Sequence, residues 1–299
     1  MTGRAVKTAS GAGAGTGAEA GAGVTSNRRR RRSTILIAGC VPAGLIAVLA
    51  LVSFFWLPYP LDDTSGDRLA PPGPSHLLGT DKLGRDLLSQ VMIGARIALE
   101  SGAGAVAIGG VLGVAAGLAA GFANRWVDDT FSAFLDVLIA FPTLLLAMLV
   151  VAAQSASLGS AIVAIGLAMT AVVARLTRIL VKRVLAEDYI TAARTSGTSW
   201  PRVITGHVLP NIWPTLVVNL ALQFGLAVLA EASLSFLGLG APPPNASWGR
   251  MLQEAQATVS TAPYGAIAPG VLLVALVVGV NLIADGLRDT LDPTRRRSS

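Results

Sequence analysis

The chain has 299 residues, of which 53% are hydrophobic and only 13% are charged, and its formal net charge is +6. A soluble domain usually carries roughly 25% charged residues, so this composition argues against a water-soluble protein. The positive charge does not indicate a nucleic-acid partner, because the basic residues form short clusters beside apolar stretches. Cys40 is the only cysteine, which excludes an intrachain disulfide and, with two histidines, leaves little for a metal site. We expect an all-α protein in the lipid bilayer, with no cofactor and no metal.

Residues 1–33 are predicted to form a disordered basic tail. They are rich in Gly, Ala, Thr and Ser, and they lack the large apolar side chains that offset the entropy of folding. The arginines at 28–32 and the apolar stretch 34–57 together resemble a signal peptide. That stretch exceeds the about 7 to 15 residues of a signal-peptide core, and no small-residue cleavage site follows it. We therefore predict the first membrane-spanning helix at 34–57.

Five further apolar stretches reach the length of about 20 residues that a helix needs to cross a bilayer. They lie at 97–122, 131–153, 158–178, 214–237 and 264–287, which gives six predicted spans. Lys and Arg concentrate in the connecting segments on the side of the N-terminus, so we expect both termini in the cytoplasm. The main transmembrane domain is predicted at 96–293, followed by a basic tail at 294–299. A row of glycines on the second span predicts close helix packing: Gly109, Gly113, Gly117 and Gly121.

The segment 58–95 is predicted to be an extracytoplasmic loop that contains an amphipathic helix. Its second half carries apolar residues at helical spacing, which favours a position at the outer membrane interface before the second span. The residues concerned are Leu83, Leu87, Leu88, Val91 and Met92. The stretch 79–86, GTDKLGRD, raises the idea of phosphate or cation binding, but a capped helix that packs on the bundle or on a partner is the simpler interpretation.

The segment 187–211 reads EDYITAARTSGTSWPRVITGHVLPN and predicts two short helices. The first extends over about 188–196, with Asp188 as N-cap and Gly197 just after its end. The second begins at Ser199 or Trp200, and Pro210 is expected to end it.

This pair of helices presents small residues beside two large anchors. Ala192, Ala193 and Gly197 leave room for close approach, and Tyr189 and Trp200 flank them. Such a surface suits a knob that inserts into a cleft on a partner. The alternative is an interfacial helix that lies on lipid.

The 187–211 segment resembles the EAA loop of bacterial ABC importer permeases. The matching positions are Ala192, Ala193, Gly197, Leu209 and Pro210. In that family the loop forms the coupling helix, which docks on the ATPase subunit. Thr191 stands where the name-giving glutamate would be. His207 stands where many members have isoleucine, and the peptide-importer branch commonly has histidine there.

Three further stretches narrow the resemblance to the second permease subunit of the dipeptide, oligopeptide and nickel importers. They are HLLGTDKLGRDLLSQVMIGAR (76–96), EASLSFLGLGAPPPNASWGRML (231–252) and NLIADGLRDTLDP (281–293). The resemblance implies a multi-pass subunit of the bacterial cytoplasmic membrane. Its implied partners are a homologous permease, two ABC ATPases and an extracytoplasmic solute-binding protein. The implied ATPase-coupling residues are Tyr189, Thr191, Ala192, Ala193, Gly197, Trp200, His207, Leu209 and Pro210.

The chain carries no signature of its own catalysis. It contains no GxxxxGK[ST] phosphate loop, no HExxH and no GxSxG, so we predict no catalytic residue and expect ATP hydrolysis on partner subunits. The predicted function is uptake of di- or oligopeptides by alternating access. Alternatives are a nickel-importing permease, an ion-coupled secondary transporter and a membrane scaffold. Secondary transporters usually show internal repeats and charge relays in the membrane, and we see neither clearly in this sequence.

Glu231 is the candidate for a residue that lines the transport pathway. An ionisable group at bilayer depth costs about 2.5 to 3.5 kcal/mol on insertion scales, so such a residue usually faces protein or water. The equal alternative is an interface carboxylate held by a backbone or arginine partner.

Overall fold

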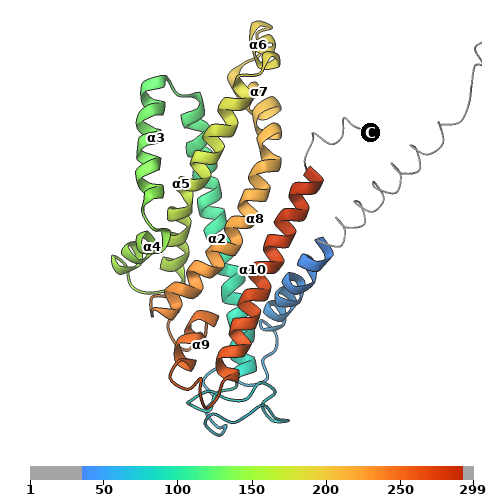
Figure 1. Cartoon of the computed structure of the whole chain (residues 1–299), viewed down its shortest axis with the longest axis vertical. Helices are drawn as coiled ribbons and strands as arrows, with labels where there is room; N and C mark the ends of the chain where they lie inside the picture. The colour runs from blue at the N-terminus through green and yellow to red at the C-terminus, as the bar shows by residue number, and fades with distance from the viewer. Residues whose placement is uncertain (1–35, 292–299) are drawn as a thin grey trace, which may run out of the picture.

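The computed structural model describes residues 36–291, which form a bundle of long helices with short helices at both ends (Figure 1). Within this part of the chain, the only pairing of extended residues is a single bridge between Thr80 and Asp86. The predicted helical fold is therefore confirmed for these residues. The tails predicted at 1–33 and 294–299 lie outside them.

In chain order the helices are Leu36–Val52, α2 (Leu87–Phe122), α3 (Arg125–Ala140), α4 (Thr143–Ala152), α5 (Leu158–Leu185), α6 (Asp188–Thr195), α7 (Trp200–Val203), the π-helix η1 (Ile204–Val208), α8 (Leu209–Phe236), α9 (Trp248–Ala255) and α10 (Tyr264–Leu291).

Four of the described helices are long and apolar enough to cross a membrane. They are α2, α5, the continuous run Trp200–Phe236 and α10. The pair α3 and α4 makes a fifth candidate if it is counted as one bent span. The helix Leu36–Val52 is apolar but shorter, and the first residues of the span predicted at 34–57 lie outside the described part. The six-span topology stays a prediction.

The span predicted at 131–153 is two helices rather than one. α3 ends at Ala140, α4 begins at Thr143, and the two are bent by 87°. Phe141 between them has an extended backbone, with φ −73° and ψ 132°. Pro142 explains the break, because proline disfavours helical geometry in the residue before it and has no N–H for the helix ladder.

The amphipathic segment before the second predicted span is the beginning of α2, which is one helix of 36 residues. Leu87, Val91 and Met92 are buried, and Leu87 and Val91 pack in one core cluster with Trp248 and Met251 of α9. The apolar stripe thus packs within the protein, and its expected position at the membrane interface stays a prediction. Its apolar partner is a helix that lies far away in the sequence.

The predicted glycine row brings α2 and α5 into close contact. A Cβ atom added at Gly113 would lie 2.6 Å from the Cβ atom of Val173. One added at Gly117 would lie 2.5 Å from the carbonyl oxygen of Ala174. Any larger side chain would force the helices apart, so the row serves helix packing, as expected.

The two ends of the bundle carry different short elements (Figure 1). α6 and α7 lie at one end, where α5 finishes and α8 begins. α9 and the segment 58–86 lie at the opposite end. We call these the α6 end and the α9 end.

Candidate partner-docking site

The predicted first helix of the 187–211 segment is α6, and Gly197 terminates it. Glu187, one residue before the predicted Asp188, occupies the N-cap position. Gly197 has a φ of +83°, the N–H of Gly197 donates to the carbonyl of Arg194, and the N–H of Thr198 donates to Ala193, both at 3.0 Å. This paired bonding is a Schellman motif, which requires the left-handed backbone that glycine adopts without strain. The predicted position of Gly197 just after the helix is confirmed.

The prediction that Pro210 ends the second helix is wrong. The chain stays helical from Trp200 to Phe236, and Pro210 lies in the first turn of α8. The π-helix η1 precedes it, and the N–H of Leu209 donates to the carbonyl of Ile204. Pro210 has no N–H to donate, and the wider π-turn shifts the bonding pattern just before it. The second half of the segment is therefore a direct extension of α8.

One buried side chain fixes α6 to the rest of the bundle. Ile190 is 3% exposed and packs in a cluster with Val181 of α5 and with Val208, Ile212 and other residues of the α7 to α8 run. Because Ile190 is the one buried residue of α6, this apolar contact determines the position of the helix. A displacement of α6 is expected to move the ends of α5 and α8 with it.

The small residues of α6 are available to a partner. Thr191, Ala192 and Gly197 are exposed, and a Cβ atom added at Gly197 would have no neighbour within 4 Å. Ala193 is half-buried. This end of the bundle therefore presents a surface of small side chains that nothing in the described chain covers.

Trp200 stands beside that surface and is held from two sides. Its indole meets the ring of Phe122 edge-on at 5.3 Å between centroids, and the Arg194 guanidinium lies 4.2 Å from the indole ring centre. The side chain still exposes 44% of its area. A tryptophan that is oriented yet half-exposed is typical of an anchor in a protein interface.

Tyr189 and His207 lie on neighbouring elements, with ring centroids 6.1 Å apart. The side-chain amide of Asn211 donates to the Tyr189 hydroxyl at 3.3 Å and to the carbonyl of His207 at 2.7 Å. Burial, with a smaller contribution from the Glu187 carboxylate, raises the pKa of Tyr189. The phenol is therefore neutral at physiological pH and offers a hydroxyl to a partner.

The predicted coupling residues thus gather at one end of the bundle. Most are exposed, whereas Ala193, His207 and Leu209 are half-buried. Sequence reasoning missed Ile190, Arg194 and Asn211, which position the others. A single large aliphatic residue in an otherwise polar short helix was the signal that could have identified Ile190.

Glu231 lies elsewhere, near the α9 end of α8, and is only 2% exposed. Its carboxylate accepts a hydrogen bond from the hydroxyl of Ser235 at 2.6 Å. Beside it, α9 approaches so closely that a Cβ atom at Gly249 would lie 2.0 Å from the carbonyl oxygen of Ala232. A serine hydroxyl thus holds the carboxylate, in place of the backbone or arginine partner of the alternative, and the lining role stays a prediction.

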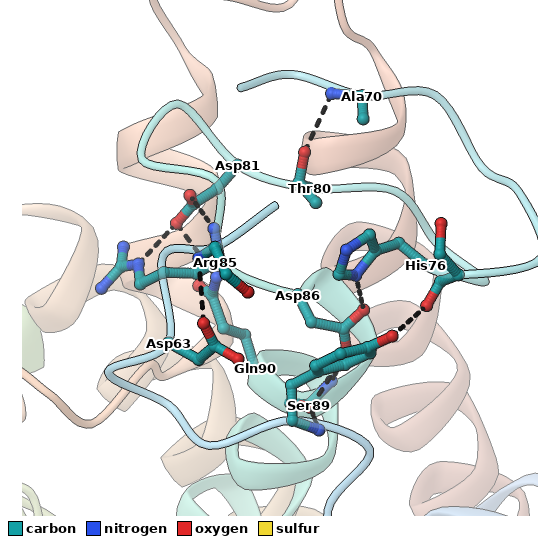
Figure 2. Close-up of polar contacts among 12 residues, drawn as sticks. Asp63, Ala70, His76, Thr80, Asp81, Arg85, Asp86, Ser89 and Gln90 are labelled. Carbon is teal, nitrogen blue, oxygen red and sulfur yellow. Dashed lines mark hydrogen bonds and ion pairs between the residues drawn. The ribbon is translucent and has the colours of Figure 1, made fainter. Parts of the chain in front are cut away.

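The GTDKLGRD stretch builds a polar network at the α9 end (Figure 2). Asp86 caps α2 by accepting from the N–H of Ser89 at 2.7 Å, and it also contacts Nδ1 of His76 at 3.0 Å. Asp81 accepts from Arg85 and Gln90. The predicted capped helix is confirmed. These carboxylates are already engaged by the protein, so the phosphate or cation alternative loses its support.

Arg85 extends this network to α9. Its guanidinium donates to Glu254 at 2.9 Å while its other side holds Asp81 at 2.7 Å. Arg250 donates to the second oxygen of the Glu254 carboxylate at 3.0 Å. The segment 58–86 and α9 are therefore joined by charged hydrogen bonds as well as by apolar contacts.

The fold is that of a helical, multi-pass membrane protein with an exposed surface of small residues at one end. Residues 113–297 match the family described as "Binding-protein-dependent transport system inner membrane component". The chain belongs to this family, and within it to the permeases of the dipeptide, oligopeptide and nickel ABC importers.

Three relatives support that assignment. The chain is 40% identical over 227 residues to the dipeptide transport system permease protein DppC of Alkalihalophilus pseudofirmus, covering 76% of this chain and 75% of the relative. It is 39% identical over 261 residues to the glutathione transport system permease protein GsiD of Pectobacterium atrosepticum, covering 85% and 86%. A putative peptide transport system permease protein of Brucella suis is 40% identical over 251 residues, covering 83% and 84%. These relatives are named as transport components, not as enzymes.

Proposed function

We propose that this chain forms, with a homologous permease, the pathway through which a bacterial ABC importer takes up di- or oligopeptides. The observation that carries the proposal is the uncovered surface of small residues on α6, at the position of the family's coupling loop. The cargo is inferred from the relatives, whose names specify dipeptides, glutathione and peptides.

In the proposed topology the chain crosses the cytoplasmic membrane six times, and the α6 end faces the cytoplasm. The basic residues Arg183, Arg194 and Arg202 are exposed at that end, as expected for the cytoplasmic side. Two ABC ATPases would bind there, one on this chain and one on its homologue. A solute-binding protein would deliver cargo at the α9 end.

The proposed mechanism is alternating access driven by the ATPases. When ATP binding brings the ATPases together, the α6 of each permease subunit moves with its ATPase. Ile190 transmits this movement, because it packs against residues of both α5 and α8. The two long helices then swing and open the pathway on the opposite side.

A single substitution tests the docking surface without disturbing the fold. Ala192→Trp adds bulk at an exposed helical position, so the permease should insert and assemble, fail to retain the ATPases in pull-down, and lose uptake. Ala133→Trp, at an exposed position of α3, is the matched control. It should retain the ATPases in pull-down and keep its uptake activity. Full uptake by an assembled Ala192→Trp complex would contradict the proposal.

Cargo and energy source need separate measurements. The cognate solute-binding protein should bind the dipeptide Ala-Ala and not Ni²⁺, and the reverse result would favour the nickel alternative. Vesicles that contain only this polypeptide should not accumulate Ala-Ala. Accumulation without an ATPase would favour an ion-coupled carrier.

A further inference from the structure

α3 is attached to the bundle by few buried side chains. Of its 16 residues, only Asp128 and Leu135 are buried. Its apolar contact with α5 consists of Leu135 and partly buried neighbours against Ala171 and Ala174. Alanine side chains form a smooth surface, and apolar contact has no directional preference. These contacts alone therefore do not fix the position of α3 along the axis of α5.

Two cations of α5 hold the buried carboxylate of Asp128. Arg178 donates through Nε to one carboxylate oxygen at 2.5 Å and through a terminal nitrogen to the other at 2.8 Å. Lys182 contacts the second oxygen as well. The Asp128 side chain is 5% exposed, and a buried carboxylate is stable only when it is paired in this way. We call Asp128, Arg178 and Lys182 the α3–α5 latch.

The latch is directional, unlike the apolar contact beside it. Two-point pairing between a guanidinium and a carboxylate fixes both distance and orientation. A slip by one helical turn, about 5.4 Å, would break the two-point contact with Arg178 and leave Asp128 beside a neighbouring cation of α5 without that geometry. A second pair, Arg175 with Asp136 at 3.2 Å, follows the same antiparallel register but is half-exposed. Asp128 therefore contributes most to fixing the register of α3 against α5.

The latch lies on the part of α5 that leads to the docking surface. α5 ends at Leu185, and α6 begins at Asp188. Val181, the neighbour of Lys182, packs in the cluster that holds Ile190 of α6. Beyond the other end of α3, the extended backbone at Phe141 separates it from α4. α3 is thus tied to α5 near α6, and its helix does not continue into α4.

We propose that Asp128 is a positioning residue that makes α3 travel with α5 when the ATPases displace α6. This inference rests on the proposed function, since it needs an ATPase that moves α6. The latch adds α3 to the helices that move with α6. Without it, α3 stays behind and the pathway opens incompletely, although the ATPases still bind and hydrolyse ATP.

The test measures the position of α3 in the assembled complex. Cys40→Ser removes the only cysteine, and Phe134→Cys on α3 with Val278→Cys on α10 provide two exposed positions for spin labels. The distance between the labels is measured without nucleotide and after vanadate trapping of the ATPases. Transport of labelled Ala-Ala and ATP hydrolysis are measured on the same complexes.

With the latch intact, trapping should change the label distance. Asp128→Asn should shrink that change and lower transport per ATP hydrolysed several-fold, while ATPase binding persists. Asp129→Asn is the matched control, because the neighbouring Asp129 is 68% exposed and only approaches Arg125 at 3.8 Å. It should behave like the unaltered complex.

An Asp128→Asn complex with an unchanged distance shift and unchanged coupling would overturn the inference. If that variant does not assemble, Arg178→Lys keeps the charges and loses the two-point contact, and an unchanged shift there would overturn the inference equally. Failure of the proposed function would look different from failure of this inference. In that case even the unaltered protein would bind no ATPase and show no change in the label distance on trapping.

Discussion

The α6 end and the α9 end of the bundle use their side chains in opposite ways. At the α9 end, Asp81, Asp86 and Arg85 are engaged within the chain, and Trp248 is 1% exposed. At the α6 end, the small residues face outward, and Trp200 keeps 44% of its area exposed. The comparison teaches that similar residue types make their contacts within the chain at one end and stay exposed at the other. Paired substitutions at the two ends can test this directly.

The largest expected contrast is between the two tryptophans. Trp248 fills the space over Gly94 and donates its indole N–H to the carbonyl of Val91 at 3.1 Å. Trp248→Ala should destabilise the protein by about 3 to 5 kcal/mol, as for other large buried aromatic residues. Trp200→Ala should change stability much less, yet weaken ATPase binding. Thermal unfolding of the purified permease and ATPase pull-down separate the two effects.

Equal loss of stability in both tryptophan variants would show that Trp200 and Trp248 contribute equally to the packing of the fold. It would contradict the comparison.

A smaller contrast concerns two helix N-termini. Asp86 accepts from the N–H of Ser89, whereas Glu187 occupies the N-cap position of α6 without a side-chain hydrogen bond. Asp86→Ala should cost about 0.5 to 2 kcal/mol, the usual range for a lost cap. Glu187→Ala should be close to neutral in the same thermal unfolding measurement. A larger loss at Glu187 than at Asp86 would reverse the proposed difference.

The last contrast concerns two glycines with positive φ. Gly84 has a φ of +87° and lies so close to Gly66 that a Cβ atom would be 2.2 Å from its carbonyl oxygen. Gly197 has a φ of +83° and open space around it. Asparagine tolerates this backbone region, so Gly197→Asn should leave stability nearly unchanged, whereas Gly84→Asn should lower the unfolding temperature by steric clash. Similar unfolding temperatures for the two variants would refute the contrast.

Local signals in the sequence were sufficient for several of these features. Apolar length located the long helices, and the glycine spacing on α2 predicted its close packing. The position of Gly197 predicted a helix end, and the GTDKLGRD stretch predicted a capped helix. Each depends on residues within one or two turns of each other. Such short-range rules transfer directly from sequence to structure.

Features that depend on distant residues were not predictable in the same way. The apolar stripe of Leu87 and Val91 indicates a buried face but not what covers it, and its cover, Trp248, comes from the far side of the sequence. The burial of Glu231 depends on the same close approach of α9. At Pro142 and Pro210 the residue type is the same, but one breaks a helix and the other is accommodated after a π-turn. Packing decides between those outcomes.

The unbroken run from Trp200 to Phe236 has a mechanical consequence. It has 37 residues and is therefore about 55 Å long at 1.5 Å per residue, with the π-turn at 204–208 and Pro214 as its irregular points. Near its far end, the backbone contact between Ala232 and Gly249 allows almost no sliding. A rod held there passes a push at Trp200 on to α9, so a displacement at the α6 end reaches the opposite end of the bundle.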